Sequence, residues 1–167
     1  MKRACIAIVD AAQARIYTYD QTANADRAGA ASDTLLREEI DLVNPGRRGH
    51  DLFSTTKPGI KRQVSGGGTT DDHREAHFEQ LEHRFAKQVI EEVDRVARQR
   101  GFAHVVFVAT PRMLGELRAA GAVLRRPDLM LEYIERDLTR LTSPQIHDHL
   151  AQLHVIAPRP RPAPVVR

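Results

Sequence analysis

The chain has 167 residues, enough for one domain with a sizeable core, and its 41% hydrophobic and 28% charged residues are ordinary for a globular protein. The formal net charge of +3 is too small to indicate nucleic-acid binding by itself, so the distribution of charge matters more than its total. A single cysteine excludes an internal disulfide, and no apolar run approaches the roughly 20 residues of a membrane span. We therefore expect a cytoplasmic protein without a membrane partner.

Three strands are predicted in the first 43 residues. Residues 4–9 form a short apolar run that suits a strand buried on both faces and is too short for a signal peptide. Residues 14–19 alternate between apolar and polar side chains, which predicts a hairpin with the first strand. After a loop, residues 35–43 predict a third strand. Consecutive strands connected in this way are expected to pair antiparallel.

Residues 44–70 have no clear periodicity and contain several glycines and prolines, which predicts a long flexible loop. Between positions 46 and 62 the loop carries five basic residues against one acid, Asp51. Such a loop could neutralise nucleic-acid phosphates, or it could be a solvated basic loop without a ligand; the residues leave both readings open. The candidate nucleic-acid contacts are Arg47, Arg48, Lys57, Lys61 and Arg62.

The sequence changes character at residues 71–100, where apolar residues recur every three or four positions and predict an amphipathic helix roughly 40 Å long. The predicted stripe consists of Phe78, Leu81, Phe85, Val89, Val93 and Val96. Gly101 is a suitable stop signal. Gly66, Gly67 and Gly68 precede the helix and permit unusual backbone conformations. This order predicts a mobile loop tip on a rigid support.

The remaining elements alternate between strand and helix. We predict a buried strand at His104–Ala109, a helix from Pro111 that extends to Leu117 or Leu124, a fifth strand at 131–138 and a final helix from Ser143 to Leu153. The order β-β-β-α-β-α-β-α, with the later strands reached through helical crossovers, predicts an α/β ribonuclease-H-like mixed sheet of five strands with helices on both faces.

One domain is expected over residues 1–156. The following residues, 157–167, alternate between proline and arginine and are expected to form an extended or disordered tail.

Two patterns in the chain carry possible metal chemistry. Ribonuclease-H-like nucleases hold metal ions with carboxylates at strand ends, and Asp10 ends the first strand. The fourth strand, however, ends at Thr110 without a carboxylate, so Asp10 is interpreted as a turn residue. His73 and His77 lie four positions apart without an identified third ligand, and are interpreted as a solvated helix flank. We expect no catalytic residue, metal or cofactor, and a binding protein rather than an enzyme.

Several stretches together resemble one protein family. They are ACIAIVDAAQARIY, DLFSTTKPG, GGGTTDDHREAHFEQLEHRFAKQV, VFVATPRMLGELR and ERDLTRLTSPQIHDHL, which occur in this order between residues 3 and 153. Their order and spacing resemble the bacterial host-attachment protein family. That family is similar to the middle domain of archaeal and eukaryotic class-1 release factors, and the resemblance implies the same ribonuclease-H-like architecture.

In release factors a Gly-Gly-Gln tip precedes the long helix and enters the peptidyl-transferase centre, where it helps water to cleave the peptidyl-tRNA ester. Gly66, Gly67 and Gly68 stand at the matching place, but the residue after a glycine pair is Gly68 or Thr69 and never glutamine. The resemblance therefore implies a non-catalytic cytoplasmic module that binds RNA or the ribosome.

Two alternatives remain open. The first is a protein-interaction factor that acts indirectly in host attachment, with the proline-rich tail as a docking peptide. The second is a hydrolase for an RNA-linked ester or phosphodiester that uses the glycine tip or Asp10. The oligomeric state is not predicted.

Overall fold

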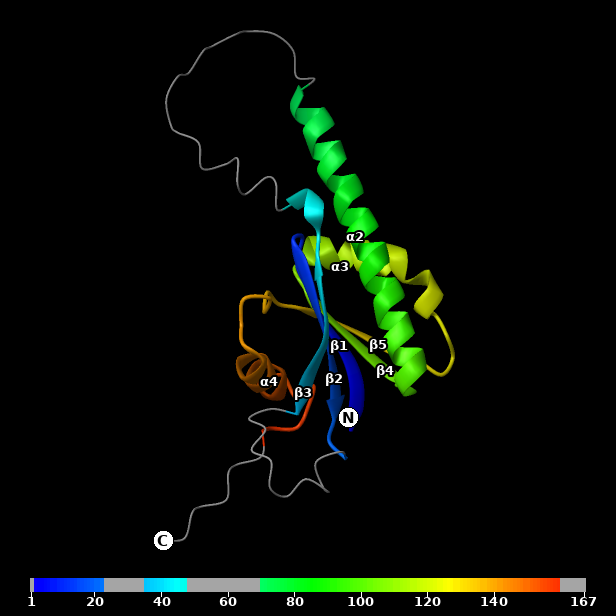
Figure 1. Cartoon of the computed structure of the whole chain (residues 1–167), viewed down its shortest axis with the longest axis vertical. Coiled ribbons are helices and arrows are strands. Elements are labelled where there is room, and N and C mark those ends of the chain that lie inside the picture. The colour runs from blue at the N-terminus through cyan, green and yellow to red at the C-terminus, as the bar shows by residue number, and fades with distance from the viewer. Residues whose placement is uncertain (1, 23–34, 48–69, 160–167) are drawn as a thin grey trace.

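The computed structural model describes residues 2–22, 35–47 and 70–159, without the side chains of residues 70–72. It shows a mixed α/β fold around one five-stranded sheet with the strand order β3-β2-β1-β4-β5 (Figure 1). The strands are β1 Arg3–Val9, β2 Gln13–Asp20, β3 Leu36–Val43, β4 His104–Ala109 and β5 Met130–Glu135. The helices include α2 Thr70–Arg100, α3 Pro111–Ala120, the 3₁₀ helix η1 Gly121–Leu124 and α4 Ser143–Gln152.

The strand directions confirm the predicted mixed sheet. Strand β2 runs antiparallel to both β1 and β3, whereas β4 runs parallel to β1 and to β5. Residues 4–9 of β1 are all buried because this strand lies at the centre of the sheet. Burial on both faces explains why its sequence is an unbroken apolar run rather than an alternating pattern.

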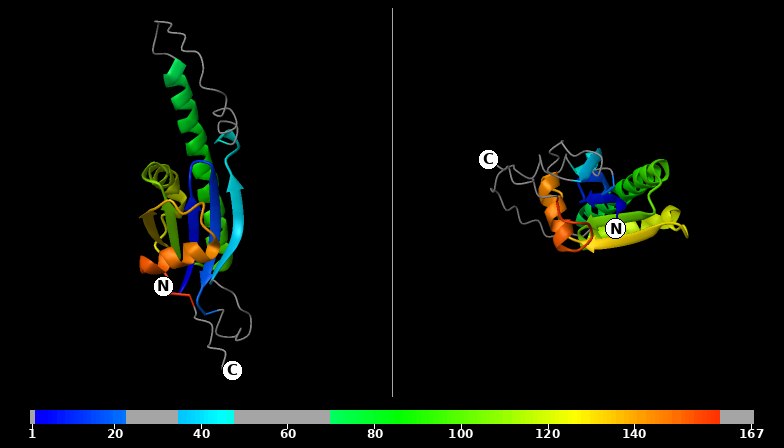
Figure 2. Two further views of the ribbon diagram at one scale, coloured as in Figure 1. Left: turned by 90° about the vertical axis from the view of Figure 1, so that its left-hand side faces the viewer. Right: turned by 90° about the horizontal axis from the view of Figure 1, so that it is seen from below.

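The sheet carries helices on both faces, as Figure 2 shows, and each face has its own core. On one face α2 and α3 pack against side chains such as Cys5, Ala7 and Phe107. On the other face α4 packs against the alternate side chains, such as Ile6 and Val108. Successive side chains of a strand point to opposite faces, so a single apolar run supplies both cores.

Helix α2 spans 31 residues and ends where the sequence predicts. Gly101 takes a φ of +64°, a left-handed conformation that favours glycine. The N–H of Phe102 donates to the carbonyl of Ala97 at 2.9 Å, and the N–H of Gly101 donates to the carbonyl of Arg98 at 3.4 Å. These two bonds form a Schellman cap, which satisfies carbonyls at the helix end.

Several predicted boundaries need correction. The helix from Pro111 ends at Ala120 and continues as the tighter turn η1. The fifth strand occupies Met130–Glu135 rather than 131–138, because Leu138 leaves the strand to pack into the core beside α4. Residues 45–47 are helical, although the sequence favoured an irregular segment there.

Helix α4 begins at Ser143, as predicted, but Ser143 is not its cap. Its N-cap is Thr142 rather than Ser143, and the backbone N–H of Thr142 donates to Gln145 Oε1 at 3.0 Å. A glutamine three positions after the cap is the reciprocal half of a capping box. Thr142 therefore serves as the cap, and Ser143 and Pro144 lie in the first turn of the helix.

Candidate functional site at the base of the projecting helix

The first turns of α2 project beyond the ends of the strands (Figures 1 and 2). The side chains of residues 73–77 are all exposed, whereas Phe85, Ala86, Val89 and Ile90 farther along the helix are buried in the core. Only the later part of α2 therefore has a core-packed face. The exposed part, residues 73–77, is called the projecting segment below.

A buried carboxylate lies where the projecting segment meets the body of the protein. Glu82 is 1% exposed, and each of its carboxylate oxygens accepts a hydrogen bond from one arginine. Arg47 Nη2 lies 2.6 Å from Oε1, and Arg112 Nε lies 2.7 Å from Oε2. We call these three residues the helix base. Because they come from the segment after β3, from α2 and from α3, their charges hold three parts of the chain together.

Close packing supplements the charges of the helix base. A Cβ added to Gly46 would lie 2.5 Å from Leu81 Cδ1, so the turn after β3 lies directly against α2. The guanidinium of Arg47 lies 5.3 Å from the centre of the Phe78 ring, within the range of a cation–π contact. The buried side chain of Asn44 donates to the carbonyl of Ala11 at 2.9 Å. These contacts also connect the base to the β1–β2 hairpin.

A second polar contact joins α2 and α3. His83 Nδ1 lies 3.0 Å from Glu116 Oε2, one turn of α3 beyond Arg112. Both side chains are partly exposed, so this contact is weaker than the pairing of Glu82. The two contacts together fix the rotation of α2 about its axis as well as its position.

Asp10 has a structural role at the end of β1. Its Oδ1 accepts hydrogen bonds from the backbone N–H groups of Ala12 and Gln13, both at 2.7 Å. Its Oδ2 accepts a bond from the hydroxyl of Thr139 at 2.8 Å. The interpretation of Asp10 as a turn residue is confirmed, since both carboxylate oxygens serve the hairpin and the chain after β5.

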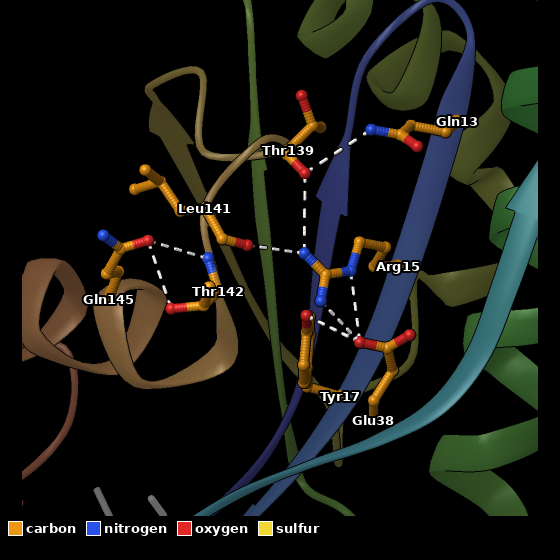
Figure 3. Close-up of polar contacts among 8 residues, drawn as sticks. All are labelled: Gln13, Arg15, Tyr17, Glu38, Thr139, Leu141, Thr142 and Gln145. Atoms are coloured by element: carbon orange, nitrogen blue, oxygen red, sulfur yellow. Dashed lines mark hydrogen bonds and ion pairs between the residues drawn. The ribbon is translucent and has the colours of Figure 1, made fainter.

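A neighbouring network holds β2 to β3 and to the loop before α4 (Figure 3). Arg15 donates to the carbonyl of Leu141 at 2.7 Å and, with Nη2, to Glu38 Oε2 at 2.7 Å. The hydroxyl of Tyr17 donates to the same Glu38 oxygen at 2.9 Å. Burial is the main cause that raises the pKa of Tyr17 to about 12, so this hydroxyl keeps its proton at neutral pH and acts as a donor.

Across residues 2–22, 35–47 and 70–159 there is no group of three or more His, Cys, Asp or Glu placed to hold a metal ion. Burial raises the pKa of the Cys5 thiol to about 12, which keeps it protonated and unreactive at neutral pH. What the contacts of Glu82 with Arg47 and Arg112 do show is a rigid attachment of α2 to the body of the protein.

A family model described as "Protein required for attachment to host cells" matches residues 5–150. The chain belongs to this host-attachment family. No match was found among curated protein sequences. In the part of the host-attachment protein that the structure describes, no helix is long and apolar enough to cross a membrane.

The structure describes only part of the predicted site. Arg47 is described and its guanidinium binds Glu82, with 31% of the side chain exposed. The other candidate contacts and the glycine tip lie outside the described residues: Arg48, Lys57, Lys61, Arg62, Gly66, Gly67 and Gly68. Contact of these residues with nucleic acid stays a prediction for this family member. His73 and His77 both lie exposed in the projecting segment.

Sequence reasoning missed Glu82 and Arg112. The signal for Glu82 was its spacing, four residues after Phe78 and seven before Val89, which places an acid on the apolar face of the helix. A carboxylate at such a position requires a cationic partner because burial of an unpaired charge is costly. The two partners lie 35 and 30 residues away along the chain, so the sequence pattern did not identify them.

Proposed function

We propose that this host-attachment protein is a non-catalytic module that binds RNA or the ribosome, with a ribonuclease-H-like fold similar to the middle domain of class-1 release factors. The strand order 3-2-1-4-5 supports this fold assignment, as do the antiparallel pairs among β1, β2 and β3 and the crossovers to β4 and β5. Helices on both faces fit the same architecture.

The rigid mount of the projecting segment carries the proposal. The glycine triplet precedes α2 in sequence, as the Gly-Gly-Gln tip precedes the long helix of release factors. The buried Glu82, held by Arg47 and Arg112, fixes the direction in which this end of α2 points. A helix end held in this way supports presentation of the adjoining basic segment to a large negatively charged partner.

The chemistry of the chain favours binding over catalysis. Thr69 follows the glycine triplet, so the side chain that assists ester cleavage in release factors has no counterpart. Asp10 is engaged by its own turn and by Thr139, which gives no support to a hydrolase built on that carboxylate. Electrostatic attraction to phosphates needs neither group, and it predicts an association that weakens with salt.

Co-sedimentation with ribosomes at low and raised salt tests the proposal. The test variant replaces Arg48, Lys57, Lys61 and Arg62 with glutamine and keeps Arg47, which the helix base requires. The matched control removes four positive charges from exposed positions on α2. These positions are Arg84, Lys87, Arg95 and Arg98.

Association that salt weakens, and that only the loop variant loses, would support the proposal. Equal loss in the loop variant and the control would show that net charge alone is responsible and would contradict a specific contact. A wild-type protein that stays unbound at low salt would also contradict the proposal.

A further inference from the structure

A group of cationic and aromatic side chains lies on α3, η1 and β5, away from the projecting segment. The guanidinium of Arg118 in α3 lies 4.8 Å from the centre of the Tyr133 ring in β5. That ring stacks on Phe107 of β4, with centroids 5.5 Å apart and planes inclined by 18°. Contacts with Phe107 and Arg118 thus fix the orientation of Tyr133 and its hydroxyl.

The hydroxyl of Tyr133 lies beside the short helix η1. A Cβ added to Gly121 would lie 3.6 Å from this oxygen, in ordinary contact. Arg118 comes just before η1 in the chain and Arg125 caps its end, so the two arginines flank this short helix. Among the described residues the hydroxyl makes no hydrogen bond to the protein, which leaves its proton available to a ligand.

The charge around this hydroxyl is positive. Burial raises the pKa of Tyr133, while the charges of Arg118 and Arg125 act against that rise. Within the described ranges neither arginine forms an ion pair, although Arg126, the next residue, pairs with Asp94 and Asp128. The chain therefore neutralises one arginine of this region and leaves two available.

We propose that Arg118, Arg125 and Tyr133 form a binding site for a phosphate group. Guanidinium groups present several N–H donors in a planar fork, and they bind phosphate through charge-assisted hydrogen bonds. The tyrosine hydroxyl adds a neutral donor. The site goes beyond the function proposed above and does not depend on the projecting segment or on residues 48–69.

An NMR titration of the full chain at constant ionic strength tests the site. The ligands are inorganic phosphate, adenosine 5′-monophosphate and adenosine, and the last controls for contacts to the base and sugar. We expect shifts at Arg118, Arg125 and Tyr133 with both phosphate ligands and none with adenosine. A single-stranded RNA oligonucleotide then distinguishes the source: tighter binding than the mononucleotide indicates a backbone phosphodiester, and weaker binding indicates a terminal phosphate.

Variants make the assignment specific. Arg118→Gln with Arg125→Gln should weaken phosphate binding about tenfold or more, and Tyr133→Phe should weaken it about threefold. The control Arg84→Gln with Lys87→Gln removes the same charge from exposed positions of α2 and should keep the affinity. Equal weakening in both double variants, or the absence of phosphate-dependent shifts, would overturn the proposal. Because the loop residues are untouched, ribosome co-sedimentation of these variants reports separately on the first proposal.

Discussion

The helix base and the C-terminal end of the described chain are held to the body in different ways, the first by charged groups and the second by a neutral one. At the base, one buried carboxylate pairs with two arginines. At residues 155–159, called the C-terminal strap here, the central group is the imidazole of His147, which is fully buried. Its Nδ1 accepts the N–H of Leu35 at 3.3 Å, so Nε2 carries the hydrogen that contacts the carbonyl of Ala157 at 2.8 Å. The neutral imidazole therefore bridges two distant segments.

The difference teaches which region responds to pH. Arginine stays charged at all ordinary pH values, so the two cations of the helix base do not change in mild acid. A neutral histidine loses its acceptor when it gains a proton, and its Nδ1–H would then face the N–H of Leu35. The arginines of the helix base thus keep their charge in mild acid, whereas the contacts of His147 in the C-terminal strap are sensitive to it.

The largest expected effect comes from leaving Glu82 without a partner. Replacement of Arg47 and Arg112 together with alanine should lower the free energy of unfolding by about 3–5 kcal/mol, because a buried carboxylate would lose both cations. Urea unfolding measures the change.

The control for this prediction adds Glu82→Leu to the double variant. Removal of the charge itself should restore most of the lost stability, since an apolar side chain has no need of a cation. If the triple variant is no more stable than the double, loss of arginine packing rather than an unpaired charge explains the effect.

The second prediction concerns His147 and pH. Burial is the main cause that lowers the pKa of His147 below its ordinary value of 6.5, although the hydrogen bond to Ala157 and the charge of Asp148 oppose it. The unfolded chain then binds more protons than the folded protein as the pH falls below 6.5. The unfolding free energy should decrease in that window by at most about 1.4 kcal/mol per pH unit and level off below the folded-state pKa.

Unfolding midpoints between pH 4.5 and 7.5 measure this dependence, with His147→Asn as the comparison. The variant should show a flatter profile over the range in which His147 titrates. The neighbours Tyr19, Asp148, His149 and Arg159 stay in both proteins, so their contributions cancel in the difference. Parallel profiles for the two proteins would contradict a neutral His147 as the acid-sensitive group.

The third prediction tests the end of α2 opposite the helix base. Gly101→Ala should destabilise the protein by about 1 kcal/mol, because a Cβ is strained at a φ of +64°. No atom lies within 4 Å of the added Cβ, so the cost comes from the backbone alone.

Gly115→Ala is the matched control for this prediction. Gly115 also has open space around a new Cβ but lies within α3, where alanine should stabilise the helix by about 0.5–1 kcal/mol. Thermal unfolding compares the two, and changes of the same sign would contradict the assignment of strain to Gly101.

Local pattern predicted the elements of this fold, whereas contacts between distant segments decided the candidate site. The run at residues 4–9 predicted a central strand because burial on both faces requires apolar side chains throughout. The stop at Gly101 was likewise predictable, since a left-handed residue favours glycine. Thr142 was missed as a cap because Ser143 and Pro144 gave a competing local signal.

The polar side chains of the site were harder to predict for a physical reason. Glu82 and His147 are buried because groups elsewhere in the chain satisfy them, and a single position does not reveal those groups. Arg47 illustrates the same limit: in the sequence it belongs to a basic run, and in the structure its guanidinium neutralises Glu82.

The smallest expected effect concerns the C-terminal strap and tests whether an ion pair or the burial of side chains holds it in place. Arg159 binds both oxygens of Asp148, at 2.6 and 2.7 Å, and this bond lowers the pKa of that carboxyl. Both side chains are substantially exposed, so Arg159→Gln should leave the unfolding midpoint unchanged within error. The strap should stay in place because Val155 and Ile156 are buried and Ala157 keeps its bonds.

Amide hydrogen exchange at Ala157 decides this point. Its N–H donates to the buried hydroxyl of Tyr19 at 3.1 Å, so Tyr19→Phe should accelerate exchange there, whereas Arg159→Gln should change it by less than about twofold. Equal acceleration in the two variants would mean that the ion pair holds the strap. The contrast between a charged helix base and a neutral C-terminal strap would then be wrong for the strap, because both regions would depend on a pair of arginine and carboxylate.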